Sequence, residues 1–414
     1  MPSTRRLPPL WLRGFCNATL GFSNGVAFFL LPQLLASAHV PEPKIAAITA
    51  IATTPNFWFV LFGPILDVRF SRRWYATLSA ALSGLAATVA ILSVHHLVVL
   101  SIALVVCNAS AMLSSSALGG WLAHITPGAE KNTLSKWINI AAIGGNGLIV
   151  AVGAEFVRRL PILPAALLVG AVVFLPTAVF PFLPAPGVDR KLAGESFVQF
   201  SHEVLGMLRR REVVVVLLLF LSPCSTFVLP NLLGGLGNDF HASARAVSLA
   251  GGAGAFLPAL LGCSVFPIIA RRLPLRFFYL SNGILGCLFT LGLIFLPHTA
   301  TTFTLAVFGE YLFQAIAFSV QIGIIFEAIG PDNPLAATTF SFLTAATNVP
   351  VAWVTLVDGH GYSLGGIGGM LCIDGMIGIL TCLLAGWLLT RVDSRTATGK
   401  TSVSPIEGPL EENP

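Results

Sequence analysis

Glu310 is the residue in this sequence whose type and position most clearly suggest chemistry, because it is an acid within the long apolar run 300–326. The run contains no lysine or arginine, and a lone carboxylate in lipid costs several kcal/mol when it is charged. Burial therefore favours the protonated form, and a carboxyl group that binds a proton on one side and releases it on the other can provide proton coupling. Asp374, within the run 365–390, is a second candidate. The alternatives are a permanently neutral Glu310 that hydrogen-bonds a neighbour and a packing role for Asp374.

Amide and hydroxyl side chains recur at helical spacing in three of the apolar runs. Spacings of four, seven and eleven residues place side chains on one face of a helix. Such a polar face suits a helix that lines a cavity, although Asn and Ser also form hydrogen bonds between packed membrane helices. The residues in question are Asn17 and Asn24 in one run, Asn108 and Ser115 in another, and Gln314 and Gln321 in the run that holds Glu310.

A charged segment at 63–75, GPILDVRFSRRWY, separates two apolar runs, and its sequence from Pro64 recurs 203 residues later, from Pro267, as PIIARRLPLRFFY at 267–279. Three cations and one acid are not stable in lipid, so the segment is expected to be a tight loop at one membrane face. The second copy has Ala270 in the position of Asp67. We expect Asp67 with Arg73 to brace the closed form, near a helix N-terminus or a neighbouring acid, and to do so in one half only. The expected gating residues are Asp67, Arg69, Arg73, Arg272 and Arg276.

The composition of the whole chain indicates a membrane protein. Of its 414 residues, 55% are hydrophobic and only 10% are charged, whereas a soluble chain carries roughly a quarter charged residues. The apolar runs are continuous and long enough for membrane-spanning helices, not the alternating segments of a β-barrel. The net charge of +5 comes from cations in short loops, so we expect the lipid bilayer, and no nucleic acid, as a partner.

The apolar runs predict an all-α membrane protein with twelve transmembrane helices in two pseudo-symmetric six-helix bundles. The repeated charged segment supports two halves of one origin. The expected organisation is an N-terminal bundle at 1–183, a cytoplasmic linker at 184–212, a C-terminal bundle at 213–391 and a disordered cytoplasmic tail at 392–414. The predicted spans are 11–36, 45–66, 74–94, 97–122, 136–157, 162–183, 213–233, 246–270, 276–296, 300–326, 335–357 and 365–390.

The distribution of basic residues predicts the orientation of these spans. With the N-terminus inside, all but four of the 23 lysines and arginines fall in cytoplasmic segments. The exceptions are Lys44, Arg158, Arg159 and Arg245. Basic residues are enriched in short cytoplasmic loops. We therefore expect both termini in the cytoplasm, and we expect a monomer.

The two-fold plan and its charged loop resemble the major facilitator superfamily. Gly63 and Asp67 match the G-x-x-x-D start of that family's loop, and Arg72 and Arg73 supply its basic end. Val68 replaces the arginine that usually follows the acid. The resemblance implies a secondary transporter that works by alternating access, with helices 1, 4, 7 and 10 around a central cavity. It implies substrate binding by Asn17, Asn24, Asn108, Ser115, Gln314 and Gln321.

A narrower resemblance covers the first part of the chain. Residues 20–25 (LGFSNG), 57–67 (FWFVLFGPILD) and 72–74 (RRW) are similar to segments of AmpG-type muropeptide permeases and their siderophore-permease and acetyl-CoA-transporter relatives. This resemblance implies a small amphiphilic cargo, such as a muropeptide, siderophore or peptide. It also implies the bacterial inner membrane as the location.

Motifs for other functions are missing from the sequence. There is no P-loop, no HExxH and no CxxC pair, so we expect no cofactor and no metal, and the energy source is expected to be a gradient, most simply of protons. The match of residues 21–25 to G-x-S-x-G lies inside a predicted membrane helix, whereas a nucleophile elbow needs a strand before it. The other classes considered are an intramembrane enzyme and a non-transporting sensor on the same scaffold. We expect the protein not to be an enzyme.

Overall fold

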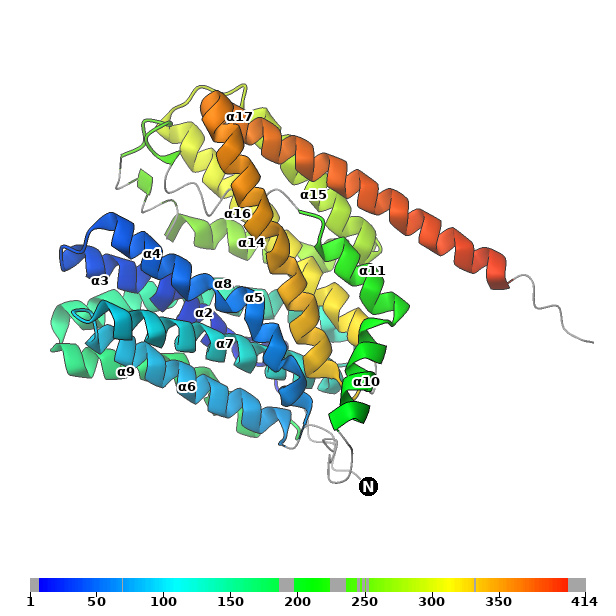
Figure 1. The fold of residues 1–414 in the computed structure, drawn as a ribbon, viewed down its shortest axis with the longest axis horizontal. Coiled ribbons are helices and arrows are strands. Elements are labelled where there is room, and N and C mark those ends of the chain that lie inside the picture. Colours follow the sequence, from blue (N-terminus) through cyan, green and yellow to red (C-terminus); the bar gives the residue numbers. More distant parts are fainter. Residues whose placement is uncertain are drawn as a thin grey trace, which may run out of the picture.

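The computed structural model describes residues 7–68, 70–185, 197–223, 236–243, 246–247, 250, 253–330 and 333–400. Its regular structure is helical throughout these residues, without a strand (Figure 1). Within this part of the chain, nine helical segments are long and apolar enough to cross a membrane. The prediction of an all-α membrane protein is therefore confirmed.

The N-terminal half consists of helical passages joined by short turns. Some passages are divided, because Pro55 begins one short helix and Pro64 lies inside a 3₁₀ segment. Proline lacks the amide hydrogen and its ring disfavours a regular α-helix. In chain order the elements are α1 (Leu10–Phe15), α2 (Ala18–Gly25), the π-helical η1 (Val26–Leu30), α3 (Leu31–Ser37), α4 (Glu42–Thr53), α5 (Pro55–Trp58), η2 (Phe59–Asp67), α6 (Arg72–Leu92), α7 (Leu97–Ile125), η3 (Gly128–Glu130), α8 (Lys131–Arg159), α9 (Ile162–Phe174) and η4 (Leu175–Phe182).

The C-terminal half is preceded by the linker helix α10 (Phe197–Leu208). The described helices that follow are α11 (Arg211–Phe220), α14 (Ala253–Ile269), α15 (Leu275–Leu293), α16 (Ala300–Ile329) and α17 (Ala336–Lys400).

Helix α17 contains two passages, which we call its first and second arms. They join at Gly365 and Gly366, whose backbone angles are not helical. Gly366 has a φ of +56°, a conformation that glycine adopts without steric cost. The chain turns back at this point (Figure 1). The backbone of α17 is helical as far as Lys400, whereas the sequence led us to expect disorder from residue 392; residues 401–414 lie outside the described part.

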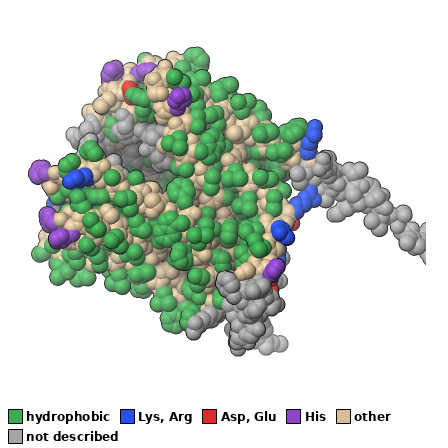
Figure 2. Space-filling model, in the orientation of Figure 1, with side chains coloured by type: hydrophobic (Ala, Val, Ile, Leu, Met, Phe, Trp, Pro, Cys, Tyr) green, Lys and Arg blue, Asp and Glu red, His purple; other side chains and the backbone are tan. Residues whose placement is uncertain are grey.

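Small residues allow several helices to pack closely. A Cβ atom built on Gly84 of α6 would lie 2.6 Å from the carbonyl oxygen of Gly170 on α9. Large apolar side chains instead cover much of the outside (Figure 2); Val98, for example, is 74% exposed and Phe295 is 87% exposed. Such a surface is suited to contact with lipid tails. The chain is an integral membrane protein.

The two halves pack against each other through two groups of helices. Helix α8 packs against α14 and α16, and η2 and α7 pack against α17 (Figure 1). We call the end of the bundle where η2 meets the start of α17 the Asp67 end. The opposite end, which carries the loop between α6 and α7, is the His95 end.

Candidate functional site

Asp67 connects the two halves at the end of η2. Its carboxylate accepts hydrogen bonds from the backbone amides of Ala337 (3.2 Å) and Thr338 (2.7 Å) and from the Thr338 hydroxyl (2.7 Å). These groups belong to the first turn of α17, where amide hydrogens lack partners within the helix. A carboxylate at this position is also stabilised by the helix dipole. Asp67, which is only 2% exposed, therefore caps a helix of the opposite half.

Arg72 completes this connection at the start of α6. Its Nε donates to Asp67 over 2.7 Å, and its Nη2 donates to the carbonyl oxygen of Pro334 over 2.9 Å. Its Nη1 lies 3.1 Å from Nδ1 of His124 on α7. The guanidinium group is planar and can bond several acceptors at fixed angles. We refer to Asp67, Arg72, His124, Pro334, Ala337 and Thr338 together as the gate.

The gate differs from the sequence prediction in the partner of the acid. Among the described residues, Asp67 forms its ion pair with Arg72, whereas we expected Arg73. Side chains of adjacent residues on a helix point about 100° apart, and Arg72 is the one directed inward, since it is only 7% exposed. Arg69 lies outside the described residues. In the second copy of the segment, Arg272 is exposed and Arg276 is half-buried, within electrostatic range of Glu327.

A second set of hydrogen bonds joins the halves between α8 and α16. Ser135 donates to the carbonyl oxygen of Ser319 over 2.5 Å, and Asn139 donates to that of Phe318 over 3.2 Å. Lys131 Nζ lies 3.3 Å from the carbonyl oxygen of Phe326. These bonds and the gate together keep the Asp67 end closed in this structure.

The linker helix α10 also contacts the gate region. Met207 is buried with Leu335, and Val68 packs against both. The Thr339 hydroxyl lies 2.8 Å from the Met207 sulfur. The linker therefore contacts both η2's end and the first turn of α17, and it covers the closed junction from outside.

Four of the six predicted substrate-binding residues form hydrogen bonds between helices. Ser115 donates to Asn17 over 2.7 Å, and Asn108 donates to the carbonyl oxygen of Ala52 over 2.7 Å. Gln321 bonds to the hydroxyl of Tyr279 over 3.1 Å. These contacts agree with the alternative role in helix packing. Asn24 and Gln314 are half-buried, and Gln314 also has an interaction within the structure.

Glu310 is completely buried within the C-terminal half. Thr290 on α15 donates to its Oε1 over 2.6 Å, and its Oε2 has no hydrogen-bond partner in the part of the chain that the structure describes. The side chain is therefore directed toward α15. The neutral, hydrogen-bonded form that the sequence left open as an alternative is compatible with this geometry.

Asp358 and Asp374 lie on the two arms of α17, and both are buried. Their exposed fractions are 0% and 1%. The arms cross where a Cβ atom on Gly361 would lie 3.0 Å from the carbonyl oxygen of Gly369, which places the aspartates on facing turns. Asp374 is within electrostatic range of both Asp358 and Glu310. The four aspartate oxygens have no hydrogen-bond partner among the described residues.

These three buried acids carry no compensating positive charge within the described structure. The ion pairs found there join Arg13 to Glu130, Arg72 to Asp67, and Arg158 and Arg159 to Glu155. Each buried charge would cost several kcal/mol. The acids therefore favour neutral forms and can change charge only by exchanging protons. No group of His, Cys, Asp or Glu suited to a metal ion occurs among the described residues.

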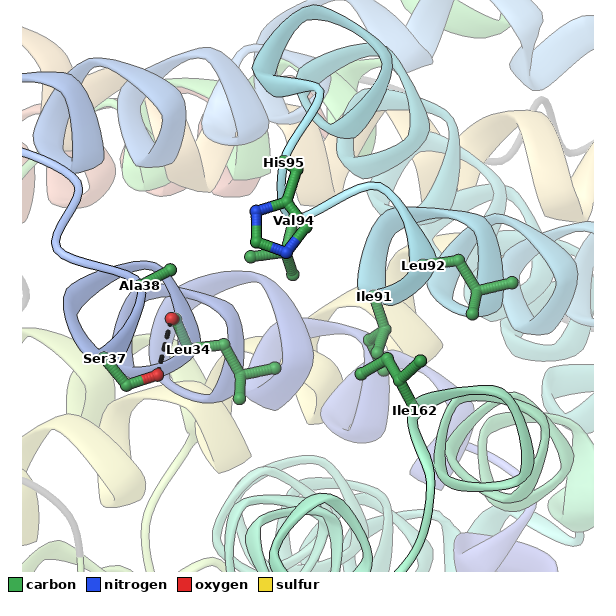
Figure 3. A pocket seen from close by; sticks show the side chains of 8 residues that line it. All are labelled: Leu34, Ser37, Ala38, Ile91, Leu92, Val94, His95 and Ile162. Carbon is green, nitrogen blue, oxygen red and sulfur yellow. Dashed lines mark hydrogen bonds between the residues drawn. The ribbon is translucent and has the colours of Figure 1, made fainter.

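An apolar cavity of about 370 Å³ lies at the His95 end (Figure 3). It is formed by the ends of α3 and α6, by the loop that holds His95 and by the start of α9. The Ser37 hydroxyl there donates to the carbonyl oxygen of Leu34. Because these elements all belong to the N-terminal half, the cavity does not lie between the halves, and we do not assign it to the cargo.

Three residues of these sites were missed or misjudged from sequence. Arg72 was noted only as part of a basic pattern. His124 is a single histidine near the end of an apolar run, and its arginine partner is 52 residues away. Asp358 lies one residue beyond the predicted span 335–357, whereas in the structure the helix continues past it to Gly365. For Asp358, the absence of proline between it and Gly365 was the available signal, although two glycines in that stretch pointed the other way.

Two helical halves, joined by a capped helix and a buried ion pair at one end, form the architecture of a membrane transporter. Comparison with known families makes the assignment specific. The family described as "Major Facilitator Superfamily" matches residues 14–333. The match covers most of the chain, which therefore belongs to the major facilitator superfamily. It is a transporter and not an enzyme.

Solved structures of transporters share this fold at low sequence identity. The chain is similar to a variant of the E. coli fucose:proton symporter FucP, with a TM-score of 0.71 and 14% identity over 92% of this chain and 98% of that one. The chain is also similar to the proton:xylose symporter XylE bound to 6-bromo-6-deoxy-D-glucose, with a TM-score of 0.66 and 14% identity over 90% of this chain and 93% of that one. For the human organic anion transporter MFSD10 (TETRAN), the TM-score is 0.67 and the identity is 17% over 93% of this chain and 100% of that one. None of the curated proteins compared with the chain matched it.

Proposed function

We propose that this protein is a proton-coupled secondary transporter that moves a small amphiphilic solute by alternating access. The observation that carries the proposal is Glu310, a fully buried acid with one hydroxyl partner and no ion pair in the described structure. Two transporters of similar fold are described as proton symporters, which is compatible with this role.

The buried acids support coupling because their charge is linked to protonation. Glu310 with a proton is neutral and stable where it lies, whereas the ionised form needs water or a rearrangement of α15 and α16. Asp374 and Asp358 are close enough for their charges to interact, so loss of a proton from one acid disfavours loss from the others. We assign proton coupling to Glu310 and Asp374, with Asp358 as a third member.

The closed Asp67 end supports alternating access. The gate and the α8–α16 hydrogen bonds fasten the two halves there, so opening that end requires these bonds to break together. In the proposed cycle, the structure represents the state closed at the Asp67 end. We retain Asp67 as a gating residue with Arg72 as its partner, and Arg73, Arg272 and Arg276 as secondary candidates near the same end.

The polar residues suit a cargo with neutral hydrogen-bonding groups. Asn24 and Gln314 are half-buried on helices from opposite halves, and their amides can both donate and accept. Asn17 with Ser115, and Asn108 and Gln321, contribute by holding the neighbouring helices in place. The resemblance of residues 20–25 and 57–67 to muropeptide and siderophore permeases favours a muropeptide-, siderophore- or peptide-like solute.

The test is uptake into proteoliposomes with and without an imposed proton gradient. Pools of muropeptides, siderophores and peptides identify the cargo, and the coupled protein should accumulate it only with the gradient. Glu310→Gln should lower gradient-driven accumulation by about tenfold or more, because the amide cannot exchange a proton. It should leave exchange of labelled for unlabelled cargo across equal pH largely intact.

Glu155→Gln is the matched control. Glu155 is partly exposed and pairs with Arg158 and Arg159 of its own helix, so the same substitution there should leave accumulation near the wild-type level. Gradient-driven accumulation by Glu310→Gln at the wild-type level would contradict the coupling role. Accumulation that never responds to a gradient would contradict symport altogether.

A further inference from the structure

We propose that His124 is a positioning residue of the gate, and that its neutral form holds Arg72 in place while its protonation releases the gate. This role is additional to proton coupling and does not depend on Glu310. It rests on the position of one ring nitrogen of His124 between two competing partners.

Nδ1 of His124 lies 3.1 Å from Nη1 of Arg72 and 2.9 Å from the carbonyl oxygen of Gly120. A ring nitrogen without a proton accepts a hydrogen bond, and one with a proton donates. The arginine has only donors, whereas the carbonyl oxygen is only an acceptor. Nδ1 therefore serves Arg72 only when the imidazole is neutral with its proton on Nε2.

Protonation of the imidazole reverses this arrangement. Nδ1 then carries a hydrogen and donates to the carbonyl oxygen of Gly120, one turn earlier in α7. Arg72 loses an acceptor and faces a second cation at hydrogen-bonding distance, which is unfavourable in a site with little water. Histidine is the side chain that makes this change between about pH 5 and 8.

The consequence reaches both halves, because Arg72 holds two further groups. It donates to Asp67, which caps α17, and to the carbonyl oxygen of Pro334 just before that helix. Displacement of the guanidinium group therefore weakens the ion pair and the contact with the C-terminal half together. Acidification at the Asp67 end should favour opening at that end.

Other charged groups near His124 do not replace this switch. Asp67 on η2 is already bonded to Arg72 and to α17. The facing start of α17, residues 336–345, contains no titratable side chain, and neither do α2 and α5, which also pack on α7. Further charged groups at this end include Arg73 on α6, Arg13 paired with Glu130 beside Thr126, and Glu327 of α16 near Lys131 and Arg276. Helix α10 adds His202 and Glu203, and Arg272 lies just before α15.

The experiment measures the separation of the halves at the Asp67 end as a function of pH. Spin labels are placed at Trp74→Cys and Phe277→Cys, in a background without the native cysteines. Both positions are exposed, at 60% and 58%, and they lie at the starts of α6 and α15 in opposite halves. Pulsed dipolar spectroscopy in nanodiscs, without cargo or gradient, then gives the populations of short and long distances.

In the parent protein, the long-distance population should increase several-fold as the pH falls from about 8 to about 5.5. In His124→Asn this increase should disappear, because the Asn side-chain oxygen sits in the place of Nδ1 and accepts from Arg72 at every pH. In His124→Leu the long-distance population should be high at every pH, since the acceptor is absent.

His202→Asn is the matched control, because His202 is exposed on α10 at the same end; its pH response should equal that of the parent. Glu310→Gln should also respond as the parent does, which separates this proposal from proton coupling. Two outcomes overturn the proposal: a parent that does not respond to pH, or a His124→Asn variant that opens on acidification as the parent does. Monodisperse elution of each variant confirms that it is folded.

Discussion

At the scale of single residues, Asp67 performs two tasks with one carboxylate. It neutralises Arg72 within its own half, and it caps α17 of the other half. Removing one partner of a buried ion pair typically costs about 3–5 kcal/mol. The pair with Arg72 lies within one half, but the cap on α17 exists only in the closed arrangement, so loss of the cap destabilises the closed state and shifts the population toward the open one.

Asp67→Asn should therefore lower uptake of the identified cargo by about tenfold or more, a change that corresponds to about 1.4 kcal/mol or more. Ala270→Ser, at the equivalent position of the second copy, should leave uptake near the wild-type level. The measurement is initial uptake rate in proteoliposomes at equal protein content. Small and equal effects of both substitutions would mean that the charged segment only fixes the orientation of the loop.

Residues whose role follows from their charge could be predicted from the sequence. Residues whose role depends on a contact partner distant in the sequence could not. Asp67 was recognisable because acids are rare in this apolar chain and it lies beside several arginines, with which it could form an ion pair. The choice between Arg72 and Arg73 depends on which side of α6 faces η2, and only packing decides that. His124 gave no pattern at all, because the role that we propose for it depends on contacts with Arg72 and Gly120, which lie on different helices.

At the scale of elements, the junction between α7 and α17 depends on a glycine. A Cβ atom on Gly120 would lie 2.5 Å from the backbone nitrogen of Ala337 and 2.7 Å from its Cα. Backbone atoms cannot rotate away as a side chain can, so any larger residue moves the helices apart. The affected turn is the one that Asp67 caps.

Gly120→Ala should consequently weaken the closed Asp67 end. We expect the long-distance population of the Trp74–Phe277 label pair to rise at pH 8 and uptake to fall by about tenfold. Gly147→Ala is the control, because Gly147 is also helical but no atom lies within 4 Å of its added Cβ. If Gly120→Ala retained the closed distance and normal uptake, close packing at this junction would not be required.

Helix positions followed from the apolar runs, but helix interruptions did not. The runs 335–357 and 365–390 were predicted as separate spans, and the structure shows one helix that continues to Gly365 before it turns. The mean hydropathy of the sequence falls wherever polar residues occur, even inside a continuous helix. A fall in hydropathy therefore does not locate the end of a helix. For this reason Asp358 fell just outside the predicted span 335–357. The division of α1, α2, η1 and α3 within one passage likewise has no counterpart in hydropathy.

At the scale of the whole molecule, the orientation in the membrane remains a prediction. Basic residues gather at the Asp67 end, in the segments before α6 and α15, so we propose that this end and both termini face the cytoplasm. The location proposed is the bacterial inner membrane. The same reasoning assigns His95 to the outer surface.

Single cysteines at Ser71 and His95 in a background without other cysteines test this orientation. In intact cells, an impermeant thiol reagent should label His95→Cys, and Ser71→Cys should be labelled only after the cells are opened. Labelling of Ser71→Cys alone in intact cells would reverse the assigned orientation. Equal labelling of both would indicate leaky cells, so a cytoplasmic enzyme with an exposed thiol serves as the integrity control.

The two-fold plan could be predicted from the sequence because a charged loop segment stands out between apolar runs and occurs in both halves. The family match agrees with this plan. The contacts between helices could not be predicted from the sequence. They depend on how closely two helix backbones approach each other at positions such as Gly84 and Gly120. The division at 183 and 213 remains our proposal for the limits of the halves.

The first arm of α17 has a consequence for how distant parts of the protein communicate. Its first turn holds Ala337 and Thr338, and Asp358 lies near its other end. At 1.5 Å per residue, these points are about 30 Å apart on one helix, in which Pro350 leaves one backbone hydrogen bond unmade. Pro350 lies between these two points, so a tilt of the arm at its Asp358 end can be absorbed there before it reaches the turn that Asp67 caps. We therefore expect the gate and the buried acids to respond to pH separately.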